Sequence, residues 1–484
     1  MKKIIISKLF LYKHRFVIGY ILLGLAFTIL LFTLPLFAQT GLSEAEMQSA
    51  INANNLQPSS IVGGDLVDLP YLLLQKFSIL FFGLTAYAIK LPSIIVGLGL
   101  GFLMILILNR WFKNNVSLLA SILVVLSTPF LFLAGSGTPL IMVVFWPTLL
   151  LWLGSKIQGE GKPEAKYCFA FGFSLLLSIF TPFMIYFAIF CVLFVIFQPH
   201  LRFVVKSLPK TPLIISGIIT ALVIVALGIN IISRHDIIRE LLFAGNFPFT
   251  DLIKNLSTGV SLSLSWTISK ESTFLSPLIS LPIFALALIG LFSTAKGFFA
   301  SRNSIATCLL VFTVIMTCFN SDYIMFIVLP LSIIVAHGLK YVLEKWYSLF
   351  PENPYARIFA LLPLSILLSL IIIPGLLQYI YGYHYNPNIS SEFTSDLAII
   401  RENLTDETLL LAPDSLEYNF YKILENRTNI KVVDSAEYIT EGSAVAIYKK
   451  TMPAPENLPL FSIITSEKSD NSDIIYLYKT EQGE

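Results

Sequence analysis

The sequence predicts a polytopic α-helical membrane protein of about eleven transmembrane helices, with a small C-terminal α/β domain outside the membrane. Hydrophobic residues make up 56% of the chain and charged residues only 13%, whereas soluble globular proteins are about a quarter charged. The apolar residues gather in long runs before residue 383, and polar residues follow. The net charge of +2 is uninformative about nucleic acid, but the lack of a basic stripe with interleaved aromatics excludes a nucleic-acid-binding protein.

The membrane spans are predicted from apolar runs, because a helix needs about 20 apolar residues to cross the hydrocarbon core. The run at 167–197 is long enough for two helices, and we expect them to turn at Thr181-Pro182. The first run is long and lacks a cleavage site, so we expect an anchor and not a signal peptide. The remaining runs lie near 16–37, 91–109, 116–134, 138–155, 212–232, 275–292, 304–320, 323–339 and 357–380.

The basic residues of the connections predict the direction of these spans. One set of alternate connections, counted with the N-terminus, holds 18 Lys and Arg, and the opposite set holds six. Cytoplasmic connections carry the excess of basic residues in membrane proteins. We therefore expect a multi-pass cell-membrane protein with a cytoplasmic N-terminus, and with everything after about residue 383 outside the cell.

Ionisable residues are concentrated in two long outer loops, at 38–90 and 233–274. The stretch 67–90 is too apolar for a free loop, and we expect it to form an amphipathic helix on the outer surface of the membrane. In the second loop, His235 and Asp236 follow a span beside Arg234 and could bind a phosphate or a metal, although a solvated cluster is the commoner arrangement. Within the apolar spans, Gly97 and Gly101 form a G-x-x-x-G pattern, which indicates close helix packing.

Glu44 and Glu46 lie just beyond the first span, in the sequence GLSEAEM. A carboxylate at this place could act as a general base on an acceptor hydroxyl or amine. The same residues also fit a capping box, with Ser43 at the start of a helix and Glu46 three residues later. Local sequence alone favours the capping box.

The polar region at 384–484 predicts a small α/β domain, separate from a membrane domain at 1–383. It contains 17 acidic and 8 basic residues. Helical patterns at about 391–403 and 415–425 alternate with strand-length runs that are rich in β-branched or aromatic residues. These runs lie at 408–412, 430–434, 444–448 and 473–478.

The order of these parts resembles the GT-C superfamily of glycosyltransferases that use a polyprenyl-phosphate sugar, especially its protein mannosyltransferase and aminoarabinose transferase branch. The resemblance rests on a first span followed by GLSEAEM, on the segment LVDLPYLLLQKFSILFFGLTAYAIKLPSIIVG at 66–97, and on DYIMFIVLP at 322–330. It implies an enzyme that moves a sugar from the lipid carrier to an extracytoplasmic glycan, lipid or protein. No cofactor is implied.

The resemblance also implies roles for individual residues. Glu44 matches the acidic catalytic motif best, and Glu46 is second. Asp68 and Tyr71 fall in the substrate-binding segment, and Lys90 stands where the family has an arginine. We expect Arg234 and His235 to join Lys90 in binding the substrate.

The chain departs from the family pattern at the second acid that usually follows the third span, where it has Leu140. We therefore expect no metal site. Two other functions stay open. A transporter or lipid-linked-glycan flippase would need polar groups along a path through the bundle, and an inactive scaffold would leave Glu44 and Glu46 facing away from any cavity.

Overall fold

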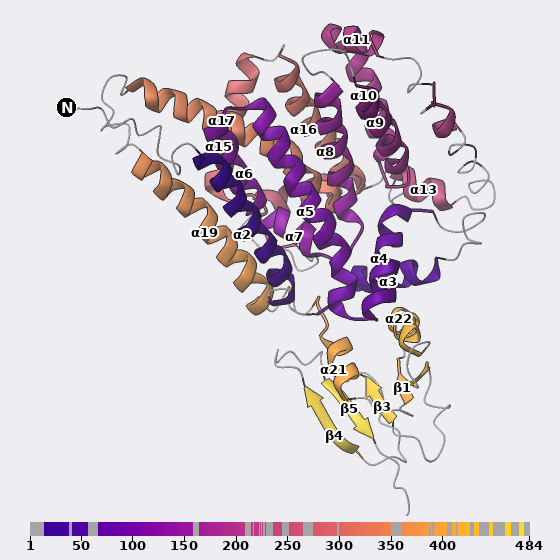
Figure 1. Cartoon of the computed structure of the whole chain (residues 1–484). Coiled ribbons are helices and arrows are strands. Elements are labelled where there is room, and N and C mark those ends of the chain that lie inside the picture. Colours follow the sequence, from indigo (N-terminus) through magenta and orange to yellow (C-terminus); the bar gives the residue numbers. More distant parts are fainter. Residues whose placement is uncertain are drawn as a thin grey trace, which may run out of the picture.

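The chain folds into a bundle of apolar helices with a small sheet beneath one end, as the computed structural model shows (Figure 1). The helices of the bundle precede residue 386, and the strands follow it. The structure describes residues 14–37, 41–56, 66–157, 164–208, parts of 214–228, 236–243, 251–264, 274–297, 300–349, 361–386, 389, 392–403, 409–412, 414–425, 430–434, 445–448, 460–465 and 474–478.

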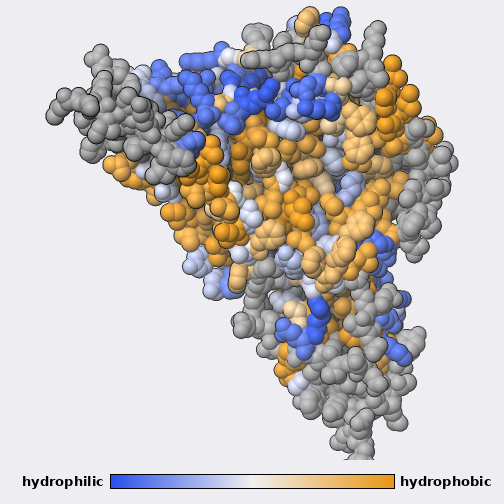
Figure 2. Space-filling view, viewed as in Figure 1, coloured by the Kyte–Doolittle hydropathy of each residue, from blue (hydrophilic) through white to orange (hydrophobic). Residues whose placement is uncertain are grey.

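Five helices of the described chain are long and apolar enough to cross a membrane. They are α2 (Arg15–Phe37), α5 (Ala86–Trp111), α8 (Leu140–Ile157), α16 (Ser301–Phe319), and α17 (Val328–Leu349) with the short 3-10 helix η4 (Ser321–Ile327) before it. Hydrophobic side chains form a broad band over this part of the surface (Figure 2). The prediction of a polytopic helical membrane protein is confirmed.

The expected span at 116–134 is broken into α6 (Asn114–Val125) and α7 (Thr128–Gly135), which are bent by 58° relative to one another. Pro129 causes the break, because a proline lacks the N–H that would continue the helix and is tolerated in its first turn. The pair counts as one broken span or as a re-entrant segment. The bend turns α7 and the residues after it toward the site described below.

Several expected spans appear as shorter apolar helices. The run at 167–197 does form two helices, α9 (Ala165–Ser178) and α10 (Met184–Phe197), with the turn at Thr181-Pro182. Each has 14 residues and so is about 21 Å long, less than the hydrocarbon core of about 30 Å. The span expected at 212–232 lies largely outside the described residues, so the count of eleven stays a prediction. The other helices of the bundle from residue 199 onward are α11 (Pro199–Lys206), α13 (Asp236–Phe243), α14 (Leu252–Leu264), α15 (Leu281–Lys296) and α19 (Leu361–Tyr385).

The expected helix over 67–90 is shorter than predicted. It is α4 (Leu69–Phe82), and it ends at Gly83, whose φ of +76° suits glycine. The next helix, α5, then begins at Ala86, because Thr85 caps it by accepting a hydrogen bond from the Ala88 N–H at 2.9 Å. Lys90 therefore belongs to the second turn of a spanning helix and not to a surface loop.

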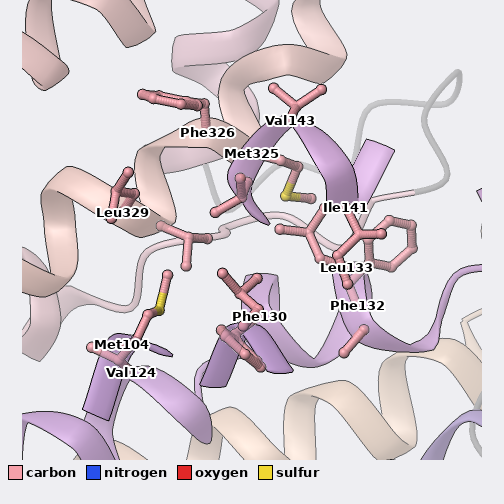
Figure 3. Packing of buried hydrophobic residues seen from close by; sticks show 14 of the residues in the cluster. Met104, Val124, Phe130, Phe132, Leu133, Ile141, Val143, Met325, Phe326 and Leu329 are labelled. Carbon is pink, nitrogen blue, oxygen red and sulfur yellow. The ribbon is translucent and has the colours of Figure 1, made fainter. Parts of the chain in front are cut away.

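The core of the bundle joins α5, α6, α7 and α8 to η4 and α17. Phe130, Leu133, Ile141, Met325 and Phe326 belong to one buried apolar cluster, part of which Figure 3 shows. The two glycines of the G-x-x-x-G pattern contribute to this packing. A Cβ at Gly97 would lie 2.5 Å from Ala134 Cβ in α7, and one at Gly101 would lie 2.5 Å from the Phe27 ring in α2. The prediction that they allow close helix packing is confirmed.

Gly338 in α17 packs against α15 so closely that a side chain would collide with backbone. A Cβ there would lie 2.2 Å from the Leu286 carbonyl oxygen. We expect Gly338→Ala to lower the free energy of unfolding by about 1–3 kcal/mol, the usual cost of overpacking, and thermal unfolding in detergent measures it. Gly24→Ala is the matched control, since a Cβ at Gly24 meets nothing within 4 Å. Equal midpoints for the two variants would contradict the backbone contact.

The C-terminal strands form one mixed sheet in the order β2-β1-β3-β5-β4. β1 (Leu409–Leu411) pairs in parallel with β2 (Lys431–Val433) and β3 (Val445–Tyr448), and β5 (Ile474–Tyr478) is antiparallel to its neighbours. These four strands lie within the four predicted runs. Sequence analysis missed β4 (Leu460–Thr465). The predicted helices appear as α21 (Asp396–Asn403) and α22 (Ser415–Glu425), while the domain boundary at 384 stays a prediction.

The C-terminal region packs against the end of the bundle through α3 (Glu44–Asn55). Met47 and Ile51 of α3 share one buried apolar cluster with Phe420 and Leu424 of α22. The backbone of Leu42 also pairs with that of Thr394 through two hydrogen bonds of 2.9 Å. Residues from both ends of the sequence therefore meet just before α3 begins.

Candidate functional site

The site is centred on Glu46 in the first turn of α3, where the predicted capping box is present. Ser43 Oγ accepts a hydrogen bond from the Glu46 N–H at 3.4 Å, and Glu46 Oε2 accepts one from the Ser43 N–H at 2.9 Å. The two hydrogen bonds satisfy N–H groups that a helix start otherwise leaves unpaired. They also fix the orientation of the Glu46 side chain.

The second carboxylate oxygen of Glu46 points to the connection between α7 and α8. Glu46 Oε1 accepts a hydrogen bond of 2.6 Å from the Gly137 N–H and lies 3.9 Å from Lys90 Nζ. Both side chains of this ion pair are only 1% exposed. Because a buried charge is costly unless it is paired and hydrogen-bonded, these contacts together allow Glu46 to be buried.

A cavity of about 240 Å³ opens beside Glu46. Its charged lining consists of the carboxylates of Glu46, Asp68 and Asp322, and its aromatic walls are Phe132, Phe274, Tyr323 and Phe393. The other lining residues are small, polar or aliphatic: Ser43, Ala45, Ser136, Thr138, Pro139, Leu140, Val143, Pro182 and Asn320. Two further hollows, along the outer faces of α14 and α19, have no charged lining. The cavity at Glu46 is therefore the best candidate for chemistry.

Asp68 reaches the cavity from the start of α4. It has a φ of +55°, and its N–H donates to the Phe180 carbonyl at 2.8 Å. Tyr71, one turn later, is fully buried behind the wall, and its hydroxyl lies 2.7 Å from Ser93 Oγ. Burial raises the pKa of Tyr71, an effect that the hydrogen bond to Ser93 opposes and the charges of Glu46 and Asp68 reinforce. Tyr71 is thus a neutral hydrogen-bonding group that supports the wall.

The structure separates the residues that the sequence grouped together. Glu46 and Asp68 line the cavity, whereas Glu44 is exposed on the outer side of α3 and is not in the lining. Lys90 lies against Glu46, with its ammonium group 5.8 Å from the Phe393 ring. Arg234 and His235 lie outside the described residues. The helix that follows them, α13, contacts the cavity wall through the Leu241 carbonyl, which accepts from the Phe183 N–H at 3.0 Å.

Of the predicted site residues only Glu46 and Asp68 line the cavity, and three of the lining residues that sequence analysis missed stand out. Asp322 opens the late segment that carried part of the family resemblance, and Asn320 lies just before it, where α16 meets η4. That segment could have suggested Asp322, because an acid there follows an apolar span. Phe393 comes from the C-terminal region, 347 residues after Glu46 in the sequence. No local pattern could have indicated it, since the Leu42–Thr394 pairing that brings it in is non-local.

The lining does not fit a metal ion. No group of three or more His, Cys, Asp or Glu side chains is arranged to hold one in the described part of the chain. Leu140, which stands where the family resemblance expects a second acid, lines the cavity with an apolar side chain.

Comparison with known proteins identifies the fold. No protein-family model and no curated protein matches the sequence. Solved structures do match. ArnT from Cupriavidus metallidurans in the apo state aligns over 96% of this chain and 98% of its own, with a TM-score of 0.55 and 12% identity. The same protein bound to undecaprenyl phosphate gives a TM-score of 0.52 with 11% identity, over the same shares of both chains.

A second similar structure is the archaeal oligosaccharyltransferase AglB from Archaeoglobus fulgidus, in complex with an inhibitory peptide and a dolichol-phosphate. It aligns over 87% of this chain and 64% of its own, with a TM-score of 0.52 and 12% identity. ArnT and AglB are both GT-C proteins. The resemblance inferred from the residues is thus confirmed at the level of the fold, and it extends over nearly the whole chain. The chain has the GT-C fold of these polytopic membrane proteins.

Proposed function

We propose that the protein is a glycosyltransferase that moves a sugar from a polyprenyl-phosphate carrier to an acceptor outside the cytoplasm. The observation that carries this proposal is Glu46, a buried carboxylate that lines a cavity of about 240 Å³ at one end of an apolar helix bundle. The fold supports the same class of donor, since ArnT has been solved with undecaprenyl phosphate and AglB with a dolichol-phosphate.

Glu46 is proposed as the general base. A carboxylate has about four lone-pair positions, and the Ser43 and Gly137 N–H groups use only two of them. The remaining positions are free to accept the proton of an acceptor hydroxyl or amine in the cavity. The acceptor atom then forms a bond to the anomeric carbon, the bond from that carbon to the carrier phosphate breaks, and the polyprenyl phosphate leaves with the electron pair.

Lys90 is proposed to balance the negative charge of Glu46 and not to bind the phosphate directly. It contacts the Glu46 carboxylate and is absent from the cavity lining. The described lining residues include no Lys, Arg or His, so the leaving phosphate needs a cation from another segment. We assign this role to Arg234, with His235 beside it, because α13 begins two residues after Arg234 and packs next to Pro182.

The lipid tail of the carrier is proposed to approach along α4. The inner face of α4 buries Tyr71, Gln75 and Ile79, while the outer face of α4 exposes large apolar side chains, including Phe77 and Phe81. That outer face continues the apolar band of the spanning helices (Figure 2). A lipid tail in the bilayer can therefore lie against α4 while its phosphate end reaches the mouth of the cavity.

The cavity is proposed to face outward. Lys90 and Arg110 stand at opposite ends of α5, about 30 Å apart for twenty residues of helix. At the Arg110 end, Lys156 and Lys296 occupy the last turns of their helices, and hydrophilic side chains border the apolar band there (Figure 2). The excess of basic residues marks this end as cytoplasmic, which leaves the cavity and the C-terminal region outside.

The proposed function is tested with the purified chain in liposomes, supplied with a radiolabelled polyprenyl-phosphate sugar and an extract of cell-envelope acceptors. We expect label to move to the acceptors, and no transfer when a nucleotide sugar is the only donor. Mass spectrometry of lipids that co-purify with the chain should detect a polyprenyl phosphate or its sugar conjugate. Movement of intact labelled lipid between leaflets, without transfer, would instead establish a flippase.

A further inference from the structure

Gln75 lies behind the catalytic cavity, on the inner face of α4, and is completely buried. It is not part of the lining, yet its amide group contacts three other segments. The oxygen accepts a hydrogen bond of 2.7 Å from Ser49 Oγ in α3. The nitrogen donates to the Ile89 carbonyl at 3.1 Å and to the Gly137 carbonyl at 3.0 Å. All the N–H donors of this side chain are therefore used.

The two carbonyls that Gln75 binds belong to the residues that hold the site together. Ile89 directly precedes Lys90, and the peptide N–H of Gly137 donates to Glu46 Oε1 at 2.6 Å. One side chain thus links the backbone next to the proposed base with the backbone next to its cationic partner. Both carbonyls can only accept hydrogen bonds, so the position demands an NH₂ group with two donors.

The two segments approach too closely for another arrangement to replace this link. A Cβ at Gly137 would lie 3.0 Å from the Ile89 carbonyl oxygen and 2.8 Å from Ile89 Cγ2. Glycine at 137 therefore lets the two carbonyls converge on a single amide. Without that amide, each of the two buried carbonyls would lose one hydrogen bond, and the structure would relax by moving the segments apart.

We infer that Gln75 is a positioning residue, which fixes the placement of Glu46 relative to Lys90 by clamping the Gly137 and Ile89 peptides. For catalysis the inference rests on the proposed function. For geometry it makes a separate claim, namely that the Gly137 N–H stays bonded to Glu46 only while Gln75 holds the Gly137 carbonyl. A displacement of about 1 Å at a reacting group can cost about 10²-fold in rate.

The test compares Gln75→Met with Gln48→Met. Methionine keeps the length of glutamine and removes the hydrogen bonds, and Gln48 is exposed on α3, where it donates to Asn52. We expect Gln75→Met to lower kcat by about 10²-fold, to leave the KM for the lipid donor within about twofold, and to speed hydrogen exchange of the Gly137 amide by about tenfold. Gln48→Met should match the wild type in all three.

Gly137→Ala is a second variant for the case in which Gln75→Met does not fold. Its added Cβ would crowd Ile89 and so disturb the same two peptides. It should also lower kcat and speed exchange at residue 137. Wild-type kcat or wild-type amide exchange in either folded variant would overturn the inference, as would a loss expressed only in KM. Failure of the proposed function would look different, because the wild type itself would then transfer no sugar. Amide exchange at Gly137 would still test whether Gln75 holds the Gly137 and Ile89 peptides.

Discussion

Glu46→Gln is expected to lower sugar transfer by about 10²–10⁴-fold, the usual contribution of a general base. Glutamine keeps the shape of the side chain and cannot accept a proton at working pH. Transfer should be measured with labelled polyprenyl-phosphate sugar in liposomes, at saturating donor, so that the loss is read in kcat. Since both Glu46 oxygens accept N–H donors, the variant also turns an NH₂ group toward one donor. A loss of stability of about 1–3 kcal/mol is therefore expected as well.

Glu44→Gln is the matched control for this prediction. The two residues share one turn of α3 and undergo the same chemical change, but Glu44 is exposed and outside the cavity lining. It should keep transfer within about twofold of wild type, as surface substitutions away from a site usually do. A large loss with Glu44→Gln and normal transfer with Glu46→Gln would transfer the role of base to Glu44. Normal transfer in both variants would remove this segment from the mechanism.

The pair also shows what the sequence could and could not predict about the site. Sequence analysis predicted a catalytic carboxylate in GLSEAEM, and it offered helix capping as an alternative role for Glu46. In the structure the same Glu46 side chain caps the helix and lines the cavity. Its Oε2 accepts the hydrogen bond of the Ser43 N–H, and its Oε1 accepts that of the Gly137 N–H. Whether Glu44 or Glu46 is the buried carboxylate depends on which face of α3 packs against Gly137 and Lys90. These residues are distant from α3 in the sequence, so a local pattern does not reveal the contact.

The fold was more predictable than the site because a membrane-spanning helix is recognised from the average hydrophobicity of about 20 consecutive residues. Apolar runs and the turn at Thr181-Pro182 need only local sequence, as do the strands at 408–412 and 444–448. Helix boundaries near Gly83 and Pro129 were missed because single residues interrupt otherwise continuous apolar stretches. Phe393 and Gln75 could not be predicted, since each acts through contacts with residues that are distant in the chain.

Lys90→Met is expected to destabilise the protein strongly, by about 3–5 kcal/mol, because it leaves the Glu46 carboxylate buried without its cation. The ion pair is 1% exposed on both sides, so bulk solvent screens the remaining charge only weakly. Methionine is similar in length and apolar, and it creates no large cavity. Thermal unfolding in detergent and in lipid nanodiscs measures the loss. Lys422→Met is the control, because Lys422 is exposed on α22 and contacts Tyr418 there, and it should stay within about 0.5 kcal/mol of wild type.

The double variant Glu46→Gln with Lys90→Met identifies the cause of that loss. If the cost of Lys90→Met comes from an uncompensated charge, removing the charge of Glu46 as well should restore part of the stability. The double variant would then lose less than the sum of the single losses, by about 0.5–3 kcal/mol, the range seen for residues in contact. Strict additivity would mean that Lys90 stabilises α5 by its aliphatic stem alone. In that case the ammonium group would be available to a substrate phosphate, and Lys90 would take the role assigned here to Arg234.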